Sequence, residues 1–90
     1  MKLEFNMQRI ARNPVASFDI FSQKVTKSIK KKEKVDASTF SCELMGIGDV
    51  FEKQGKKPVM NKMAQRLAET LVNMGDSNLS GIIYSFPVSY

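Results

Sequence analysis

The sequence predicts a mainly α-helical fold, a three-helix core with a short strand at each terminus, with an α+β arrangement as the variant of this class. Three observations lead to this prediction. Apolar residues recur at intervals of three and four in three separate stretches, and each stretch is bounded by Asn, Asp, Pro or Gly. The two terminal stretches carry strand-like patterns instead.

The chain length fits a single domain, residues 1–90. Ninety residues can bury one core but leave no material for a second. The hydrophobic content of 42% and the charged content of 26% are typical of a globular protein rather than a disordered one. Because a core of this size is small, tight helix packing or self-association is expected to support it.

Residues 2–8, KLEFNMQ, alternate apolar and polar side chains, which is the period of a half-buried strand. We therefore predict a short N-terminal strand. A first helical turn that continues into Arg9 and Ile10 is the alternative, because so short a pattern fits both structures.

The first helix is predicted to begin at Asn13 and Pro14. Asn caps free backbone amides, and Pro at the first helical position gives up an amide that has no partner there. After Val15, the apolar face consists of Phe18, Phe21, Val25 and Ile29. Beyond Ile29 this face receives Lys32, so the last one or two turns are expected to project past the core.

The second helix is predicted to be capped by Asp36 or Ser38. Its apolar positions are spaced three and four apart: Ala37, Phe40, Leu44, Ile47 and Phe51. Gly46 and Gly48 lie within it, where each costs about 1 kcal/mol relative to Ala. They either admit a closely packed neighbouring helix or divide the region into two shorter helices. Cys42 is expected in the interior of this helix.

Gly55 and Pro58 mark a stop and a restart, and the third helix is predicted from Pro58 to Met74. Its apolar face comprises Met60, Met63, Leu67, Leu71 and Met74, with Ala64 and Ala68 beside them. Gly75 is the expected terminator, and residues 76–80 are predicted to form a turn. Residues 81–90, GIIYSFPVSY, are rich in β-branched and aromatic residues and predict a strand that Pro87 ends or confines to a sheet edge.

Nearly all of the excess charge lies in one segment. Between Lys24 and Lys34, six lysines face the single acid Glu33, so this segment carries +5, which equals the net charge of the whole chain. On a helix, one face opposite the apolar one carries Lys24, Lys27, Lys31 and Lys34, with Lys30 as an extension. Such a face binds polyanions, because each neutralised phosphate releases condensed counterions. The alternative is a solvated helix face.

A second basic cluster surrounds the Gly55 turn and the polar side of the third helix: Lys53, Lys56, Lys57, Lys62 and Arg66. Two helices joined by a short Gly-containing turn suggest a DNA-binding helix-turn-helix. In that motif the residues that face a DNA groove would be Asn61, Lys62, Gln65 and Arg66. An ordinary helical hairpin has the same pattern and is the preferred interpretation.

The C-terminal aromatic residues and the methionines are the candidates for contact with a protein. Aromatic side chains on a strand can stack on unpaired bases, but they also cover a small core or a subunit interface, which we prefer here. Methionines fill cores and form adaptable binding surfaces. The interface residues predicted in this way are Met60, Met63, Tyr84, Phe86 and Tyr90.

The residue types argue against an enzyme. Histidine is absent and there is one cysteine, which removes the usual zinc, copper and haem ligands and the commonest general base. Residues 46–49, GIGD, lack the Lys and Ser or Thr of a phosphate loop. We therefore expect no catalytic residue, no metal and no cofactor. The lone cysteine, the lack of a leader-like run after Met1 and the lack of a membrane-length apolar window predict a cytoplasmic protein.

The working hypothesis is a small non-enzymatic protein that binds DNA or RNA through phosphate contacts, without sequence specificity, because lysines hold a backbone but read no bases. The rival hypothesis is a protein-interaction module, either a small regulator or inhibitor that docks on a larger acidic protein or a homo-oligomer. Contact of the first helix with an anionic membrane surface is a weaker third hypothesis, because the core needs its apolar face.

Overall fold

The computed structural model describes the backbone of residues 7–85 and the side chains of residues 10–85. This part of the chain contains five helices and no strand. The helices are α1 (Met7–Arg12), α2 (Pro14–Lys30), α3 (Ala37–Lys53), α4 (Lys57–Asn73) and α5 (Ser77–Tyr84). The predicted mainly α-helical class is confirmed, and α2, α3 and α4 are the three predicted core helices.

The predicted C-terminal strand is wrong over residues 81–85, which belong to α5 and its C-cap. Asp76 begins this helix, because its carboxylate accepts a hydrogen bond from the Leu79 N–H with an N···O distance of 3.0 Å. Leu79 and Ile83, one helical turn apart, are both buried where α5 packs on α4. That packing outweighs the β propensity of the segment. Residues 86–90, with Phe86 and Tyr90, lie outside the described residues.

The predicted N-terminal strand is wrong at Met7 and Gln8, which open α1. The alternative of a helical turn continuing into Arg9 and Ile10 is the one observed. Burial of Ile10 in the core anchors this short helix. The Gln54 side-chain amide also donates a hydrogen bond to the Ala11 carbonyl, with an N···O distance of 2.6 Å. Residues 2–6 of the predicted strand lie outside the described residues.

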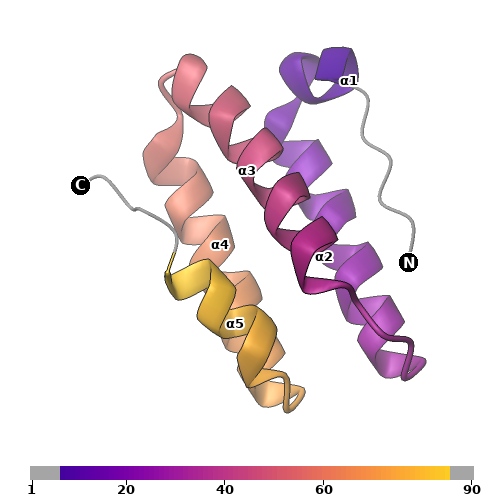
Figure 1. Ribbon diagram of the computed structural model, residues 1–90. Helices are drawn as coiled ribbons and strands as arrows, with labels where there is room; N and C mark the ends of the chain where they lie inside the picture. The colour runs from indigo at the N-terminus through magenta and orange to yellow at the C-terminus, as the bar shows by residue number, and fades with distance from the viewer. Residues whose placement is uncertain (1–6, 86–90) are drawn as a thin grey trace.

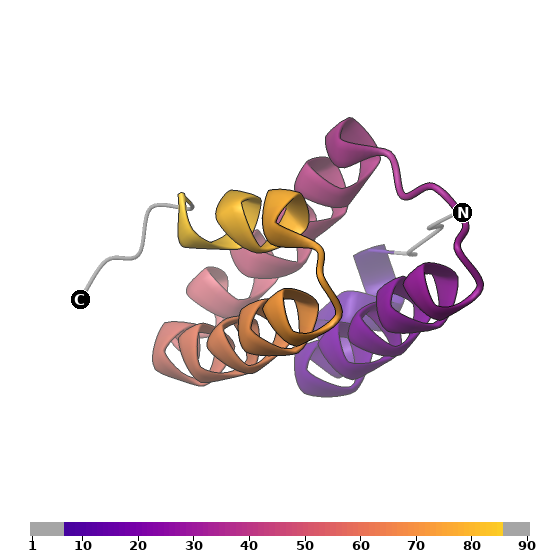
Figure 2. The ribbon, with the colours of Figure 1, turned by 90° about the horizontal axis from the view of Figure 1, so that it is seen from below.

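The helices are arranged in two layers. Figure 1 shows α2, α3 and α4 running alternately down and up, so the α2–α3 turn and the α3–α4 turn lie at opposite ends of the molecule. Seen from below in Figure 2, α2 and α4 form one layer, and α3 and α5 lie over them. The shortest dimension of the molecule, 19 Å, equals about two helix diameters.

Most of the core forms where the apolar stripes of α2, α3 and α4 meet, but Ile10 of α1 and Leu79 and Ile83 of α5 also belong to it, so the core is not confined to the three predicted helices. At its centre, each at most 1% exposed, are Phe18, Phe21, Phe40 and Phe51. The ring centroids of Phe21 and Phe40 lie 5.3 Å apart and those of Phe18 and Phe51 lie 6.3 Å apart, so these pairs join α2 to α3. Such pairs contribute about 0.5–1.5 kcal/mol each beyond their burial. Val15, by contrast, is 40% exposed.

α3 is one unbroken helix through both of its glycines. A Cβ atom at Gly48 would lie 2.9 Å from the Cε and 3.1 Å from the Sδ of Met60, so Gly48 lets α4 approach α3 closely. A Cβ atom at Gly46 would meet no atom within 4 Å. Of the two predicted alternatives, close packing is observed at Gly48 and the helix is not divided.

α2 ends earlier than its lysine-rich sequence predicts. After the C-cap Lys31, Lys32 has a φ of 59°, in the left-handed region. The Lys32 N–H donates to the Ile29 carbonyl and the Glu33 N–H donates to the Ser28 carbonyl, both at 2.9 Å, which is a Schellman motif. The predicted projecting turns are therefore absent, and beyond α2 the chain turns back toward α3.

Candidate functional site

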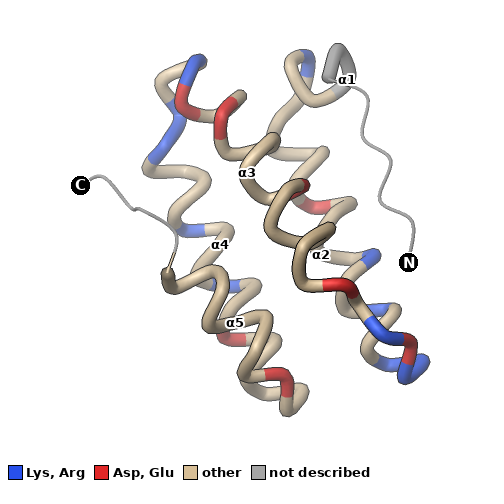
Figure 3. The backbone as a smooth tube through the Cα atoms, viewed as in Figure 1, with Lys and Arg blue, Asp and Glu red and all other residues tan. Residues whose placement is uncertain are grey.

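The six lysines between residues 24 and 34 lie together where α2 turns into α3. We call this set the lysine corner: Lys24, Lys27, Lys30, Lys31, Lys32 and Lys34. Three of them belong to α2, and the others follow it on the C-cap and the loop. All six side chains are exposed, and Figure 3 shows basic residues gathered at this turn. Because α2 ends early, Lys32 lies at the surface and joins the corner instead of the apolar face on which the sequence predicts it.

Three carboxylates accompany the lysine corner. Asp36 caps α3 and accepts hydrogen bonds from the Thr39 hydroxyl at 2.8 Å and the Thr39 N–H at 3.1 Å, which lower the pKa of its carboxyl. Burial raises the pKa of the Glu43 carboxyl on α3, and the Lys24 ammonium opposes that rise. Glu33 is exposed within the corner. Residues 24–36 hold six lysines and two acids, so the formal charge of this segment is 6 − 2 = +4.

The second basic cluster begins at the other end of α3. Lys53, Lys56 and Lys57 lie at the α3–α4 turn, and Lys62 and Arg66 follow along α4. The 17 residues of α3 span about 25 Å, which is several times the Debye length of about 8 Å at physiological salt. The lysine corner and the α3–α4 turn are therefore electrostatically separate, and Figure 3 shows basic residues at these two opposite ends and along α4.

The α3–α4 turn is partly neutralised by its own acids. The Lys53 ammonium lies 3.2 Å from the Asp49 carboxylate. The Lys57 ammonium lies 4.0 Å from the Glu52 carboxylate. The α3–α4 turn consequently presents less unbalanced positive charge than the lysine corner does.

The predicted helix-turn-helix residues do not share one environment. Asn61 and Gln65 line a groove between helices, whereas Lys62 and Arg66 are exposed and outside its lining. α3 and α4 have 17 residues each and run in opposite directions (Figure 1). This geometry is that of an ordinary helical hairpin.

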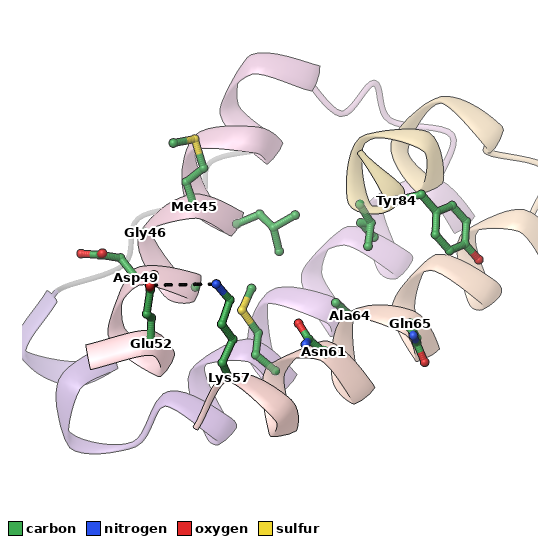
Figure 4. A pocket seen from close by; sticks show the side chains of 13 residues that line it. Met45, Gly46, Asp49, Glu52, Lys57, Asn61, Ala64, Gln65 and Tyr84 are labelled. Atoms are coloured by element: carbon green, nitrogen blue, oxygen red, sulfur yellow. Dashed lines mark ion pairs between the residues drawn. The ribbon is translucent and has the colours of Figure 1, made fainter. Parts of the chain in front are cut away.

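The groove has a volume of about 550 Å³ and opens between α3, α4 and α5. Its apolar lining includes Leu44, Met45, Met60, Ala64, Ile83 and Tyr84. Its polar lining consists of Asp49, Glu52, Lys57, Asn61 and Gln65. Figure 4 shows Lys57 reaching across one end of the groove toward Glu52. Met45 and Tyr84 are 58% and 59% exposed, so this groove combines a cavity with exposed apolar side chains.

The predicted interface residues differ in their exposure to solvent. Met60 is buried and Met63 is half-buried against the core, whereas Tyr84 is exposed beside the groove. Phe86 and Tyr90 lie outside the described residues. The sequence does not point to Met45, because it lies off the apolar stripe of α3 and only its position in the folded hairpin places it at the groove.

Cys42 lies exposed on α3, so its predicted place in the interior is wrong. Two residues of helix rotate the side chain by about 200° from the stripe residue Phe40. The helical position therefore outweighs the tendency of cysteine to be buried.

No helix within residues 7–85 is long and apolar enough to cross a bilayer. In the same part of the chain, His, Cys, Asp and Glu side chains form no group of three or more that could hold a metal ion. Comparison of the chain with protein-family models, curated proteins and solved structures gave no match. The lysine corner and the groove are the two features on which a function can be proposed.

Proposed function

We propose that this chain is a small non-enzymatic binding protein that contacts the phosphates of nucleic acid through the lysine corner. The observation that supports the proposal is the concentration of six exposed lysines at the turn from α2 to α3. Like charges three and four residues apart on a helix repel one another. A polyanion relieves that repulsion, and the release of its condensed counterions adds a favourable entropy.

The lysines of the corner are not equivalent. Lys27 and Lys30 project from the last turns of α2, and Lys32 and Lys34 extend from the loop that follows. Lys24 contributes least, because the Glu43 carboxylate lies near enough to interact with its charge. The corner therefore offers about five ammonium groups to phosphates.

The test replaces Lys27, Lys30, Lys31 and Lys34 together by glutamine and measures nucleic-acid binding by fluorescence anisotropy. At about 50 mM salt the variant should bind at least about 100-fold more weakly than the native chain. The slope of log K against log salt should also become shallower by up to about 0.9 for each phosphate that the variant no longer neutralises.

A matched control replaces Lys53, Lys56, Lys62 and Arg66 by glutamine. This control removes an equal number of positive charges from the second basic cluster. This control should change affinity only a few-fold, because Lys53 and Lys56 lie about 25 Å away along α3, and Lys62 and Arg66 lie on α4, outside the lysine corner. Equal losses of affinity in the two variants would mean that net charge alone governs binding. Absence of binding by the native chain at low salt would reject the proposal.

The groove supports a second candidate function, a protein-interaction module that acts as a small regulator of a larger protein. The observation that favours it is the exposure of Met45 and Tyr84 beside a cavity with an apolar lining. Exposed large apolar side chains that border a concave surface are typical of a protein-binding site.

This second function is tested by site-specific photocrosslinking in a lysate of the native host. A photoreactive amino acid at position 45 should yield a discrete crosslinked protein, and Tyr84→Asp should abolish that product. The matched control carries the same group at position 72, because Val72 on α4 is exposed to a similar extent, 51% compared with 58% for Met45, but lies outside the groove lining. The same product from both positions would contradict a role for the groove.

A further inference from the structure

Among residues 10–85, the lysine corner has no aromatic surface on which an unpaired base could stack. Within the described residues, Phe18, Phe21, Phe40 and Phe51 are at most 1% exposed. Tyr84 is exposed, but it lines the groove at the end of α5. Proteins that hold single strands combine a basic groove with exposed aromatic side chains, each worth about 1–3 kcal/mol per stacked base. In the part of the chain that the structure describes, the corner therefore supplies charge without a stacking surface.

The corner also has few groups that could read a base edge. Residues 24–36 contain no Arg, Asn, Gln or aromatic residue. The Thr26 hydroxyl lies within hydrogen-bonding distance of the Ser22 and Gln23 carbonyls, at 3.0 and 3.1 Å, and Ser28 is buried. Lysine is a mobile point charge without the planar fork by which arginine recognises guanine.

Charge density is therefore what this surface can recognise. A duplex carries one negative charge per about 1.7 Å of its axis, and each phosphate bound contributes a salt slope of about 0.9, compared with about 0.7 for a single strand. From this we infer that the lysine corner selects double-stranded over single-stranded nucleic acid, independently of base sequence. This inference rests on the proposed function and names the class of ligand for that same site.

The size of the preference follows from the number of phosphates bound. With about five phosphates, the difference in slope is about 0.2 × 5 = 1. If duplex and single strand bind equally at about 1 M salt, the duplex binds about 20-fold more tightly at about 50 mM and about fivefold more tightly at about 200 mM. The preference thus narrows as salt is added.

The experiment compares a short mixed-sequence duplex, a second duplex of unrelated sequence, and oligothymidine with as many phosphates as one duplex strand. Fluorescence anisotropy is measured between about 50 and 200 mM salt, the range over which the preference should narrow. The two duplexes should bind within about twofold of each other, and both should bind more tightly than oligothymidine by the stated factors.

Oligothymidine that binds as tightly as the duplexes would overturn the inference while leaving the proposed function in place. A tenfold difference between the two duplexes would also overturn it. Binding of neither duplex nor single strand would instead reject the proposed function itself. If the inference is correct, the glutamine variant of Lys27, Lys30, Lys31 and Lys34 should bind the duplex more weakly than the native chain does. Its preference for duplex over single strand should also be small, because fewer bound phosphates leave a smaller difference between the two salt slopes.

Discussion

Lys32 holds the one backbone conformation among the described non-glycine residues in which φ is positive. It occupies the position after the C-cap of α2, and the same position after α3 and α4 is taken by Gly55 and Gly75. Glycine is favoured there because a Cβ atom destabilises the left-handed conformation by about 1 kcal/mol. The sequence does not predict this turn, because a lysine that is flanked by other lysines does not indicate the end of a helix.

Lys32→Gly should therefore raise the free energy of unfolding by about 0.5–1 kcal/mol, measured by urea denaturation. Lys32→Ala is the matched control, because it removes the same charge but keeps the Cβ atom. Alanine should change stability by less than about 0.5 kcal/mol. If both variants were equally stabilising, relief of charge repulsion rather than backbone conformation would be the cause.

The contribution of the Asp36 cap of α3 to the stability of the fold depends on pH. Its hydrogen bonds from the Thr39 side chain and backbone lower the pKa of the carboxyl below its ordinary value of 3.8. A lowered pKa means that the ionised form stabilises the fold above pH 3.8, and that this contribution is lost as the pH falls through the lowered pKa.

Asp36→Asn should consequently lose less stability than the native chain between about pH 6 and about pH 2, because asparagine caps a helix without titrating. The urea midpoint at the two pH values is the measurement. Ser38→Ala is the control, because Ser38 is the alternative capping residue that the sequence suggests, and it should keep the native decline. An unchanged pH dependence in Asp36→Asn would show that other carboxyls cause the decline.

The two glycines of α3 have different surroundings. A Cβ atom added at Gly48 would contact Met60 of α4, whereas a Cβ atom added at Gly46 would meet no atom within 4 Å. The sequence identifies both as helix-weakening positions. It could not separate them, because the difference depends on a residue twelve positions later in the chain.

Gly46→Ala should raise the free energy of unfolding by about 0.5–1 kcal/mol, which is the gain in helix propensity. Gly48→Ala should gain less, because its Cβ atom would lie 2.9 Å from the Met60 Cε and displace that flexible side chain. Urea denaturation of the two variants measures the difference. Equal gains would mean that Met60 moves aside without loss of packing.

α5 shows how packing overrides local preference within one element. Its sequence, SNLSGIIY, contains Gly and β-branched residues that favour strands and turns. The Asp76 cap and the four-residue spacing of Leu79 and Ile83 are helix signals that compete with that composition. The packing of these two side chains on α4, which sequence spacing does not display, decides the outcome.

Positive charge is distributed unevenly between the two ends of the molecule. The α3–α4 turn has ion pairs with Asp49 and Glu52, while residues 24–36 hold six lysines and two acids. Alternating helices place these regions at opposite ends. Repulsion within the lysine corner should therefore destabilise the fold at low ionic strength.

Raising NaCl from about 10 mM to about 150 mM should increase the free energy of unfolding of the native chain by about 0.5–1 kcal/mol, since the Debye length shortens to about 8 Å. The glutamine variant of Lys27, Lys30, Lys31 and Lys34 should lose most of that increase. The variant of Lys53, Lys56, Lys62 and Arg66 should keep it. A decrease in native stability over this range would show that screening of the ion pairs dominates.

The helical class, the apolar stripes of α2, α3 and α4 and most of the helix ends could be predicted from the amino-acid sequence. These features depend on contacts between residues at most four apart, such as Asn13 with Ala16 and Asp36 with Thr39. Three features could not be predicted in this way: residues 77–84 are helical, the lysine corner and the α3–α4 turn lie apart, and Met45 and Tyr84 border one groove. Those outcomes depend on contacts between segments far apart in the chain, and local spacing carries no information about such contacts.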